Sequence, residues 1–298
     1  MVNEPIKILD KIAQRLESML ATQLNNCGLM FRLFSRVKTA RSLSHKMRIK
    51  GEKYRSGKAL IQDMIGLRIV AYFQDDVEAL ATYFSYGEAV GTSIDELDSS
   101  TFCPQRLNLT CPLPEEFVAD FRKALPVEYA PYIDNTYEIQ IRTVFSEGWH
   151  EVEHDLRYKC KSDWKNCEPY SRVLNGVIAT LETAEWNMKM LFDQMAHTNL
   201  QTKNYRAMLR NKMHLRIEGE DFSEEVSNFL LQHPEVAEQI LKTDRLVILL
   251  ALLNHKRSIP LTYDVLLFLI NRIEQISKEL QALEPQETQS LLNAFLRS

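Results

Sequence analysis

The segment Tyr137–Lys159 constrains the fold of this chain most, because an alternating strand leads directly into a helical pattern. Apolar residues at positions 137, 139 and 141 alternate with Glu138, Gln140 and Arg142, which predicts a half-buried strand. A carboxylate, an amide and a guanidinium in a row are unusual on a strand face that meets only solvent. We therefore expect this polar face to line a site.

A helix is expected immediately after this strand, with Thr143 or Ser146 as its cap. His150 and His154 are four residues apart, so they share one face of the helix, and Arg157 lies close by. The strand and the helix together predict a unit that gathers polar groups at one site.

The composition indicates a globular, soluble protein. The chain has 298 residues, 45% hydrophobic and 26% charged, which is enough for two modest domains. No apolar run is long enough to cross a bilayer, and the charged start is unlike a secretory signal. The five cysteines include no CxxC pair, which favours reduced thiols. We therefore expect a cytoplasmic protein that does not act in a membrane.

Positive charge is concentrated in the first 60 residues, which hold 13 Lys and Arg against 4 Asp and Glu. Within them, the segment Phe31–Gly51 predicts a short strand and then a helix. Arg36 and Lys38 fall at the end of the strand, and Ser42 and Lys46 lie four apart on the helix. A cationic junction of this kind favours binding of a polyanion, such as nucleotide phosphates or nucleic acid, over a merely solvated basic helix.

The other elements of the first half surround these two segments. Residues 61–73 predict a buried strand with Asp63 at its mouth, where a carboxylate could also be a simple turn former. Asp75 is the expected cap of the helix that follows. The remaining expected elements are helices over 4–24, 75–86 and 114–125, a strand over 106–111 and a loop over 87–103.

The second half is expected to be all helical. Residues 177–298 contain one glycine and three prolines, and helical spacing recurs throughout. We predict about six helices there, and a division of the chain into domains at residues 1–168 and 169–298.

His150–His154 also matches the HExxH pattern, in which two histidines bind zinc and the glutamate acts as a base. The pattern has only three fixed positions, so chance matches are common. Its helix is rich in acidic residues, and the next histidine along the chain is His197. A zinc metallohydrolase is therefore kept as a third interpretation.

Three ordered segments resemble motifs of the RelA/SpoT family of alarmone synthetases, which transfer pyrophosphate from ATP to the 3′-hydroxyl of a guanine nucleotide. Arg36–Lys46 is similar to the family's R-x-K…S…K element, and Asp63–Arg68 to its D-x-x-G-x-R element. Glu138–Thr143 is similar to its E-[IV]-Q-I-R-T strand, and His150–Lys159 to the helix after it. The resemblance covers roughly residues 5–165 and implies an α+β fold, with a mixed five-stranded sheet flanked by helices in the nucleotidyltransferase-like manner, before the all-helical C-terminal domain.

The resemblance implies a role for each motif residue, and these roles fit the chemistry, since phosphoryl-type transfer depends mostly on positioning and on neutralising charge. Asp63 and Glu138 would be the catalytic pair and hold Mg²⁺, which prefers oxygen ligands. Glu138 could also accept the proton of the attacking hydroxyl. The implied ATP-binding residues are Arg36, Lys38, Ser42, Lys46 and Arg68. The implied acceptor- or phosphate-binding residues are Gln140, Arg142, His150, His154, Arg157 and Lys159.

The acceptor loop departs from the family pattern. The family has G-Y-x-S-[LI]-H, whose tyrosine stacks on guanine, whereas this chain has Cys103–Asn108 at the matching place. Pro104 replaces the tyrosine, and Asn108 replaces the histidine. Phe102 or Tyr132 could supply another aromatic face. The acceptor is therefore expected to be GTP or GDP, or a different hydroxyl such as another nucleotide or a tRNA end.

The resemblance also bears on neighbouring domains and partners. Only about 30 residues precede the first motif in this sequence, so we expect no histidine–aspartate hydrolase domain and no manganese-dependent alarmone hydrolysis. Small family members often self-associate through C-terminal helices, which implies a homo-oligomer here. A toxin–antitoxin or defence partner rests on the same analogy.

Two other interpretations compete with that of a zinc metallohydrolase. The leading one is an ATP-dependent pyrophosphokinase that acts on a guanine nucleotide or another hydroxyl acceptor. The alternative is a non-catalytic nucleotide-binding sensor, whose helical half passes a ligand signal to a partner.

Overall fold

The computed structural model describes residues 4–87, 89–94, 107–255 and 258–297. The chain divides into two compact units, which are described one by one. Unit 1 comprises Met1–Ala21, Phe31–Tyr72 and Leu80–Leu181, and unit 2 comprises Thr22–Met30, Phe73–Ala79 and Glu182–Ser298. The domain boundary expected at residues 168 and 169 stays a prediction.

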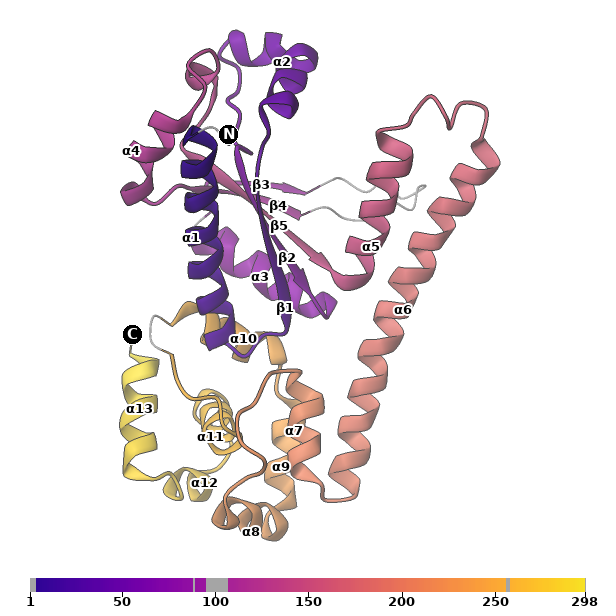
Figure 1. Ribbon diagram of the computed structural model, residues 1–298. Helices are drawn as coiled ribbons and strands as arrows, with labels where there is room; N and C mark the ends of the chain where they lie inside the picture. Colours follow the sequence, from indigo (N-terminus) through magenta and orange to yellow (C-terminus); the bar gives the residue numbers. More distant parts are fainter. Residues whose placement is uncertain (1–3, 88, 95–106, 256–257, 298) are drawn as a thin grey trace. The chain divides into compact units, whose positions relative to one another are not determined.

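Unit 1 is built on a mixed five-stranded sheet in the order β1-β2-β5-β4-β3 (Figure 1). Strands β2 and β5 are parallel, and the other neighbours are antiparallel. This confirms the α+β class with a mixed sheet flanked by helices. The strands are β1 Phe31–Val37, β2 Ile65–Ala71, β3 Gly91–Ile94, β4 Leu107–Pro112 and β5 Thr136–Thr143.

The two faces of the sheet differ sharply. On one face, Leu67, Ile139 and Leu109 are adjacent across three strands and almost fully buried. Burying each of these side chains stabilises the fold by about 1.5–3 kcal/mol. Helix α1 (Glu4–Asn26) covers this face, where its Glu17 accepts a hydrogen bond from Ser35 of β1. The opposite face carries the polar residues and meets helix α5 (Val144–Glu153), so the sheet separates α1 from α5 (Figure 1).

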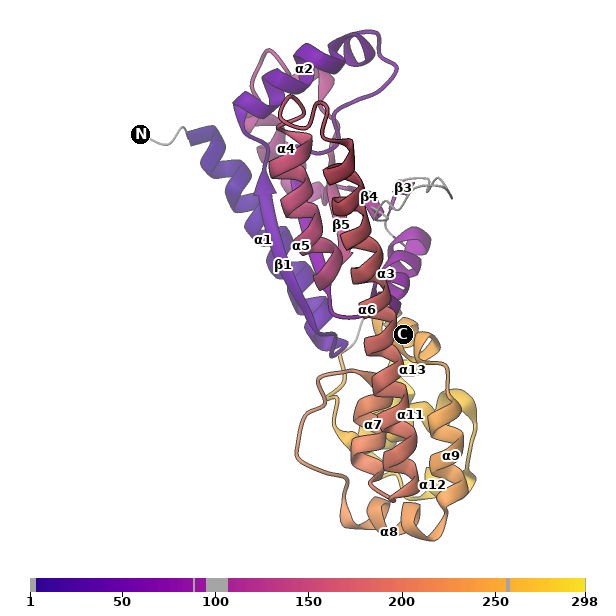
Figure 2. The same cartoon turned by 90° about the vertical axis from the view of Figure 1, so that its right-hand side faces the viewer.

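The N-terminal elements form where the sequence pattern places them. Helix α2 (Ala40–Arg55) begins after Thr39, whose side chain accepts a hydrogen bond from the Ser42 amide. It follows β1 beyond the end of the sheet (Figure 1 and Figure 2). Helix α4 (Glu115–Ala124) lies beside α1, because Arg15 of α1 contacts both Glu116 and the ring of Phe117.

Two expectations for residues 75–103 are wrong. Asp75 does not cap the next helix, because α3 (Gln74–Gly87) begins one residue earlier and the Asp75 carboxylate lies 3.2 Å from the Arg245 guanidinium instead. The expected loop contains strand β3, whose Gly-Thr-Ser-Ile sequence lacks apolar alternation but pairs with β4 at the sheet edge. Residues 88 and 95–103 of that loop lie outside the described residues.

The second half of the chain is helical, as expected, but the part that the structure describes has eight helices from Glu168 onward rather than about six. Several are too short to stand out as separate periodic segments. They are α6 Glu168–Gln201, α7 Tyr205–Met213, α8 Glu224–Gln232, α9 Pro234–Lys242, α10 Arg245–Asn254, α11 Tyr263–Glu274, α12 Lys278–Ala282 and α13 Gln286–Leu296.

Among the helices that the structure describes, none combines the length and the apolar composition that a bilayer-spanning helix needs.

Unit 2 contains a buried ionic cluster around Arg245 at the start of α10. Its guanidinium lies 2.5 Å from a carboxylate oxygen of Asp76, and its Nε donates to the Met213 carbonyl at 2.5 Å. Arg245 and Asp76 are both buried, so each charge depends on the other. These contacts join segment 73–79 to α7 and α10 within unit 2.

His214 lies beside this cluster, at the left-handed end of α7. Its ring stacks on the ring of Phe73, with 4.2 Å between the ring centroids. It also packs edge-to-face with Phe192, with 5.2 Å between the centroids. Neither ring nitrogen hydrogen-bonds to another described residue. Burial, and secondly the neighbouring Arg245 charge, lowers the pKa of His214 to about 4.

The buried His214 predicts that the folded chain loses stability as the pH falls below about 6.5, the pKa of an unfolded histidine. Between pH 6.5 and about 4 the unfolded state binds a proton that folded His214 does not, so the loss reaches about 2 kcal/mol by pH 5. Urea unfolding from pH 7.5 to 5 measures it. In His214→Asn, which cannot take up that proton and tolerates the left-handed backbone, the fall should be shallower by about this amount.

The matched control is His45→Asn, because His45 is exposed on α2. It should keep the pH dependence of the native chain. An unchanged pH dependence in His214→Asn would contradict the prediction.

Candidate functional site

The polar face of the sheet brings the three sequence motifs into adjacent rows. In one row, Arg36 of β1 pairs with Gly66 of β2, which pairs with Glu138 of β5. Two residues along each strand, the next row contains Phe34, Arg68, Gln140 and Asn108. Since side chains two residues apart point to the same face, both rows face the same side of the sheet.

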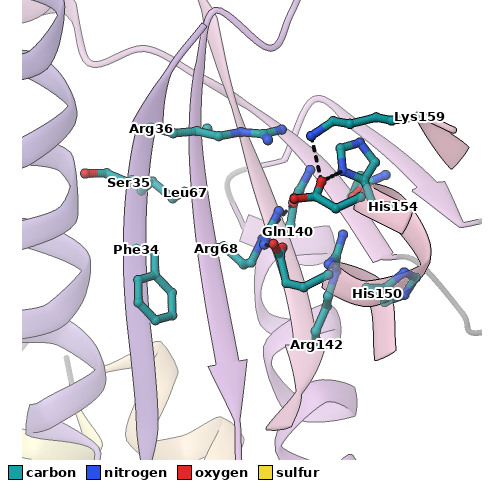
Figure 3. Close-up of a pocket in the computed structure, with 14 residues that line it drawn as sticks. Phe34, Ser35, Arg36, Leu67, Arg68, Gln140, Arg142, His150, His154 and Lys159 are labelled. Carbon is teal, nitrogen blue, oxygen red and sulfur yellow. Dashed lines mark hydrogen bonds and ion pairs between the residues drawn. The ribbon is translucent and has the colours of Figure 1, made fainter. Parts of the chain in front are cut away.

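A cavity of about 470 Å³ lies on this face, between the sheet and the helix that follows β5 (Figure 3). It gathers residues that the sequence places more than a hundred positions apart. Seven residues predicted to bind substrate line it, namely Arg36, Arg68, Gln140, Arg142, His150, His154 and Lys159.

Gly66 lies beneath the Arg36 side chain. A Cβ atom at position 66 would lie 3.4 Å from Arg36 Nε and 3.6 Å from its Cγ. A side chain larger than alanine would therefore displace Arg36 from its path across β2. This gives the glycine of the D-x-x-G-x-R segment a steric role that its sequence pattern does not reveal.

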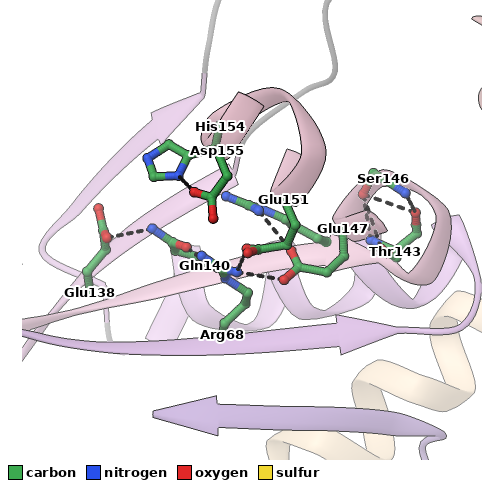
Figure 4. Close-up of polar contacts among 10 residues, drawn as sticks. Arg68, Glu138, Gln140, Thr143, Ser146, Glu147, Glu151, His154 and Asp155 are labelled. Carbon is green, nitrogen blue, oxygen red and sulfur yellow. Dashed lines mark hydrogen bonds and ion pairs between the residues drawn. The ribbon is translucent and has the colours of Figure 1, made fainter. Parts of the chain in front are cut away.

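Arg68 is the centre of a hydrogen-bond network on the cavity wall (Figure 4). It donates to Gln140 Oε1 at 3.1 Å, to Glu147 Oε1 at 2.6 Å and to Glu151. Gln140 in turn donates to Glu138 Oε2 at 2.8 Å. Burial disfavours the charged form of Arg68, but Glu147 and Glu151 outweigh it and raise the pKa of Arg68.

Glu147 bridges two of the three arginines that line the cavity, Arg68 and Arg142. Its second oxygen accepts from Arg142 Nη1 at 2.8 Å, so one carboxylate joins β2 and β5 to the first turn of α5. The Thr143–Ser146 capping box fixes that turn, with each residue bonding the other's backbone amide. Thr143 is the N-cap and Ser146 the reciprocal partner, so both expected candidates take part.

Glu147 and Glu151 were not predicted as site residues. The sequence signal of Glu147 is weak, because acidic residues in a first helical turn are common for their interaction with the helix dipole. The i, i+4 spacing places both on one face of α5, and only the register of the sheet shows that Arg68 lies opposite them.

A second charged cluster surrounds Asp63, ahead of β2. Asp63 accepts from Lys38 Nζ at 2.5 Å and from Lys46 Nζ at 2.9 Å. Burial alone would raise the pKa of Asp63, but the two lysines hold it below its ordinary value. Burial lowers the pKa of Lys38 despite the ion pair. Burial acts in the same direction on Lys46, but the contacts with Asp63 outweigh it and raise the pKa of Lys46.

The backbone fixes where these lysines lie. The Lys38 amide donates to the Met64 carbonyl at 2.9 Å, which carries the pairing of β1 with β2 one residue past the strands. Lys38 thus follows Arg36 on the same face, and Lys46 reaches Asp63 from α2. Ser42 is exposed in the first turn of α2, where its hydroxyl bonds with that of Thr39.

The helix after β5 changes its geometry beside the cavity. It continues past α5 as a π-helical turn, η2 (His154–Tyr158). There the exposed Asp155 carboxylate contacts His154 Nδ1 at 3.0 Å and Lys159 Nζ at 2.6 Å (Figure 3). It thereby holds an imidazole and an ammonium group at the rim of the cavity. Single π-turns are frequent at functional sites.

Arg157 does not line the cavity. Its guanidinium donates to Glu153 at 3.3 Å and to Asn175 of α6 at 2.8 Å. It also lies over the rings of Trp149 and Trp164. These contacts place it among the packing between α5, η2 and α6, and its binding role stays a prediction.

The two histidines of the HExxH pattern differ in exposure and in their contacts. His150 is buried, whereas His154 is half exposed and contacts Asp155. In the part of the chain that the structure describes, no group of three or more His, Cys, Asp or Glu side chains could hold a metal ion. The zinc interpretation therefore gains no support from these residues.

The acceptor side is described only in part. Asn108 lies on β4, pairs with Gln140 and lines the cavity. Phe102 and the segment 103–106 lie outside the described residues. Tyr132 is at the end of the short helix η1 (Ala130–Tyr132), where its carbonyl accepts from the Ile61 amide at 2.8 Å.

Comparison with known proteins gives matches only among solved structures. No family model matches the chain, and no curated protein matches it. Small alarmone synthetase 1 from Bacillus subtilis is 21% identical with a TM-score of 0.45, over 62% of this chain and 93% of that chain. A GTP pyrophosphokinase family protein from Streptococcus pneumoniae is 19% identical with a TM-score of 0.43, over 62% and 87%.

The Streptococcus mutans protein smu.1046c is 20% identical with a TM-score of 0.47, over 63% of this chain and 94% of that chain. Because each match has low identity and a TM-score below 0.5, the assignment of function rests on the residues of the site.

The bridge made by Glu147 predicts that Glu147→Gln lowers the stability of the fold by about 1.5–3 kcal/mol, since a neutral amide cannot replace both charge-assisted hydrogen bonds. Glu115→Gln is the matched control, because Glu115 is also in a first helical turn and exposed, so it loses only a helix-dipole contribution of about 0.3–1 kcal/mol. Urea unfolding at pH 7 compares them, and equal losses in the two variants would refute the bridge.

Proposed function

We propose that this protein is an ATP-dependent pyrophosphokinase that transfers pyrophosphate to the 3′-hydroxyl of a guanine nucleotide or a related acceptor. The observation that carries this proposal is the meeting of three motifs around one cationic cavity. Arg36, Arg68 and Arg142 come from three separate strands and line the same cavity. Asp63 lies just ahead of β2 and Glu138 lies near the start of the neighbouring strand β5, and neither is among the residues that line the cavity.

The donor side has the groups that a triphosphate requires. Arg36, Lys38 and Lys46 supply positive charge along the end of β1 and the start of α2. Guanidinium groups bind phosphate oxygens with two parallel hydrogen bonds, and ammonium groups act as point charges. In the proposed complex, these groups neutralise the phosphates and orient the β-phosphate for attack, which is most of what a pyrophosphate transfer requires.

Asp63 and Glu138 fit a hard cation. Both offer carboxylate oxygens, which Mg²⁺ prefers, and phosphate oxygens and water would complete the shell. Bound Mg²⁺ would polarise the phosphates and offset their developing charge. Asp63 is paired with two lysines, which keep it ionised, and a bound cation would take the place of one or both of these contacts.

Glu138 is also the proposed acceptor of the 3′-hydroxyl proton. One of its oxygens, Oε2, is held by Gln140, which is itself fixed by Arg68. This chain of contacts orients the carboxylate before substrate arrives. A positioned base of this kind typically contributes about 10²–10⁴-fold to rate.

A nucleotide sensor without turnover is the second candidate. The ion pairs of Asp63 with Lys38 and Lys46 favour it, because a cation has to compete with two lysines for the same carboxylate. Both candidates share binding of ATP, and they differ in product formation.

Asp63→Asn and Glu138→Gln should each abolish transfer. The loss should be on the order of 10³-fold for Asp63→Asn, which removes a metal ligand and the lysines' counter-charge. For Glu138→Gln it should be about 10²–10⁴-fold. Product formation from labelled ATP in the presence of Mg²⁺ measures both.

The controls are Asp120→Asn and Glu128→Gln, which make the same chemical changes at exposed positions. Circular dichroism and ATP binding by calorimetry show whether each variant stays folded. If native protein binds ATP and yields no product with any acceptor, the sensor replaces the enzyme. Equal activity of Glu138→Gln and native protein would remove Glu138 from the mechanism.

The acceptor is predicted to differ from a plain guanine nucleotide unless another aromatic replaces the missing tyrosine. Stacking of a base contributes about 1–3 kcal/mol, so its loss weakens GTP or GDP binding by roughly 5–150-fold. A panel of ATP, GTP, GDP, GMP and bulk tRNA as acceptors measures this preference. Efficient use of GDP or GTP would mean that another side chain provides the stacking face, and Tyr132→Ala then tests one candidate.

A further inference from the structure

The outer surface of α2 carries positive charge that the proposed site does not use. Four residues of α2 are buried against unit 1, namely Leu43, Met47, Gly51 and Tyr54. The other sides of the helix and the turn that follows it carry six exposed cationic residues: Arg41, Arg48, Lys50, Lys53, Arg55 and Lys58. In the views of Figure 1 and Figure 2, α2 lies at the end of unit 1, beyond the sheet.

Three of these residues form a straight row. Arg41, Arg48 and Arg55 are seven residues apart, so they recur almost every two turns along one side of α2. At 1.5 Å per residue, the row extends about 21 Å along the helix axis. A row of this length is much larger than the phosphate group of one nucleotide.

These charges are not balanced by neighbouring acids. None of the six cations forms an ion pair with another residue in the described ranges, and Glu52 is the one acidic residue between Arg41 and Lys58. By contrast, Lys46 on the same helix is paired with Asp63. The whole chain has a net charge of -4, so this surface is a local exception.

The placement of Arg41 is also costly for the helix itself. The first turn of α2 contains no acidic residue, although negative charge is favoured there by the helix dipole. Arg41 in that turn opposes the dipole. The stability of α2 therefore does not explain Arg41, whereas Lys53 and Arg55 lie in the last turn, where the helix dipole favours positive charge.

We propose that the outer row of α2, defined by Arg41, Arg48 and Arg55, binds the phosphate backbone of a nucleic acid strand. A regular polyanion matches an extended row of guanidinium groups, which contact phosphates without reading bases. This surface goes beyond the proposed function and stands whether or not the cavity performs pyrophosphate transfer.

A lipid surface fits this helix less well. A membrane-binding amphipathic helix inserts its apolar face between lipids. The apolar face of α2 is occupied by unit 1, since Leu43, Met47 and Tyr54 are buried there. Ile49 is the one large apolar side chain exposed on α2, which is too little apolar surface for insertion among lipids. Binding to α2 therefore depends mainly on charge, and a nucleic acid strand supplies charge at regular spacing along its length.

The test uses the full chain and a fluorescein-labelled single-stranded RNA of about 20 nucleotides and mixed sequence. Fluorescence anisotropy gives the affinity between 0.05 and 0.3 M KCl. The triple variant Arg41→Gln, Arg48→Gln, Arg55→Gln should lower the slope of log affinity against log salt by about 2, because each lost contact removes about 0.7. Its affinity near 0.1 M salt should fall on the order of 100-fold.

The matched control replaces Arg210, Lys242 and Lys278 with glutamine, which removes three exposed positive charges from unit 2. It should change the affinity by less than about threefold. Circular dichroism confirms that both triple variants stay folded. Phosphatidylserine vesicles serve as a second probe. Two results would overturn the proposal: no RNA binding by the native chain at 0.1 M salt, whether or not the vesicles bind, or equal losses in the two triple variants.

Discussion

The parallel register of β2 and β5 is the constraint on which the candidate site depends. It aligns Gly66 with Glu138 and Arg68 with Gln140, so two motifs far apart in sequence share one face. A slip of one residue would turn either strand over and bury its charges against α1. Leu67 and Ile139, buried on the opposite face, hold the register because that slip would also expose them. The apolar core therefore specifies the geometry of the polar site.

Carboxylates keep the cationic residues of unit 1 in place before any ligand binds. Glu147 joins Arg68 to Arg142, and Asp63 joins Lys38 to Lys46. Without these partners, like charges gathered on one sheet face would repel each other and move toward solvent. Each anion thus lowers the cost of assembling a cationic cavity, and a phosphate that enters it has to share cations already engaged. The contacts that hold the cations in place are thus the same ones that a bound phosphate has to weaken.

Local patterns predicted the elements that hold the site, because their signals are short-range. Alternation at 137–142 indicated β5 directly, and the change of pattern within Phe31–Gly51 indicated the helix after β1. β3 was missed because its pairing, rather than its composition, makes it a strand, and Asp75 was misassigned because its partner Arg245 is distant in sequence. Resemblance to known motifs supplied the cavity residues, whereas Glu147 and Glu151 became visible only once α5 was placed over β2. Contacts between residues distant in sequence thus determine the features that local sequence patterns could not predict.

The π-helical turn η2 has a consequence for how this surface can change. A π-turn contains one more residue than an α-helical turn over the same stretch. Removing one residue from His154–Tyr158 would let the turn close as regular α-helix, while the residues after it kept their direction relative to α5. Lys159 would then stay at the cavity rim, and the side chains within the turn would be the ones that moved. In this region the helix absorbs a change of one residue, so the length of the turn sets which of its own side chains face the ligand.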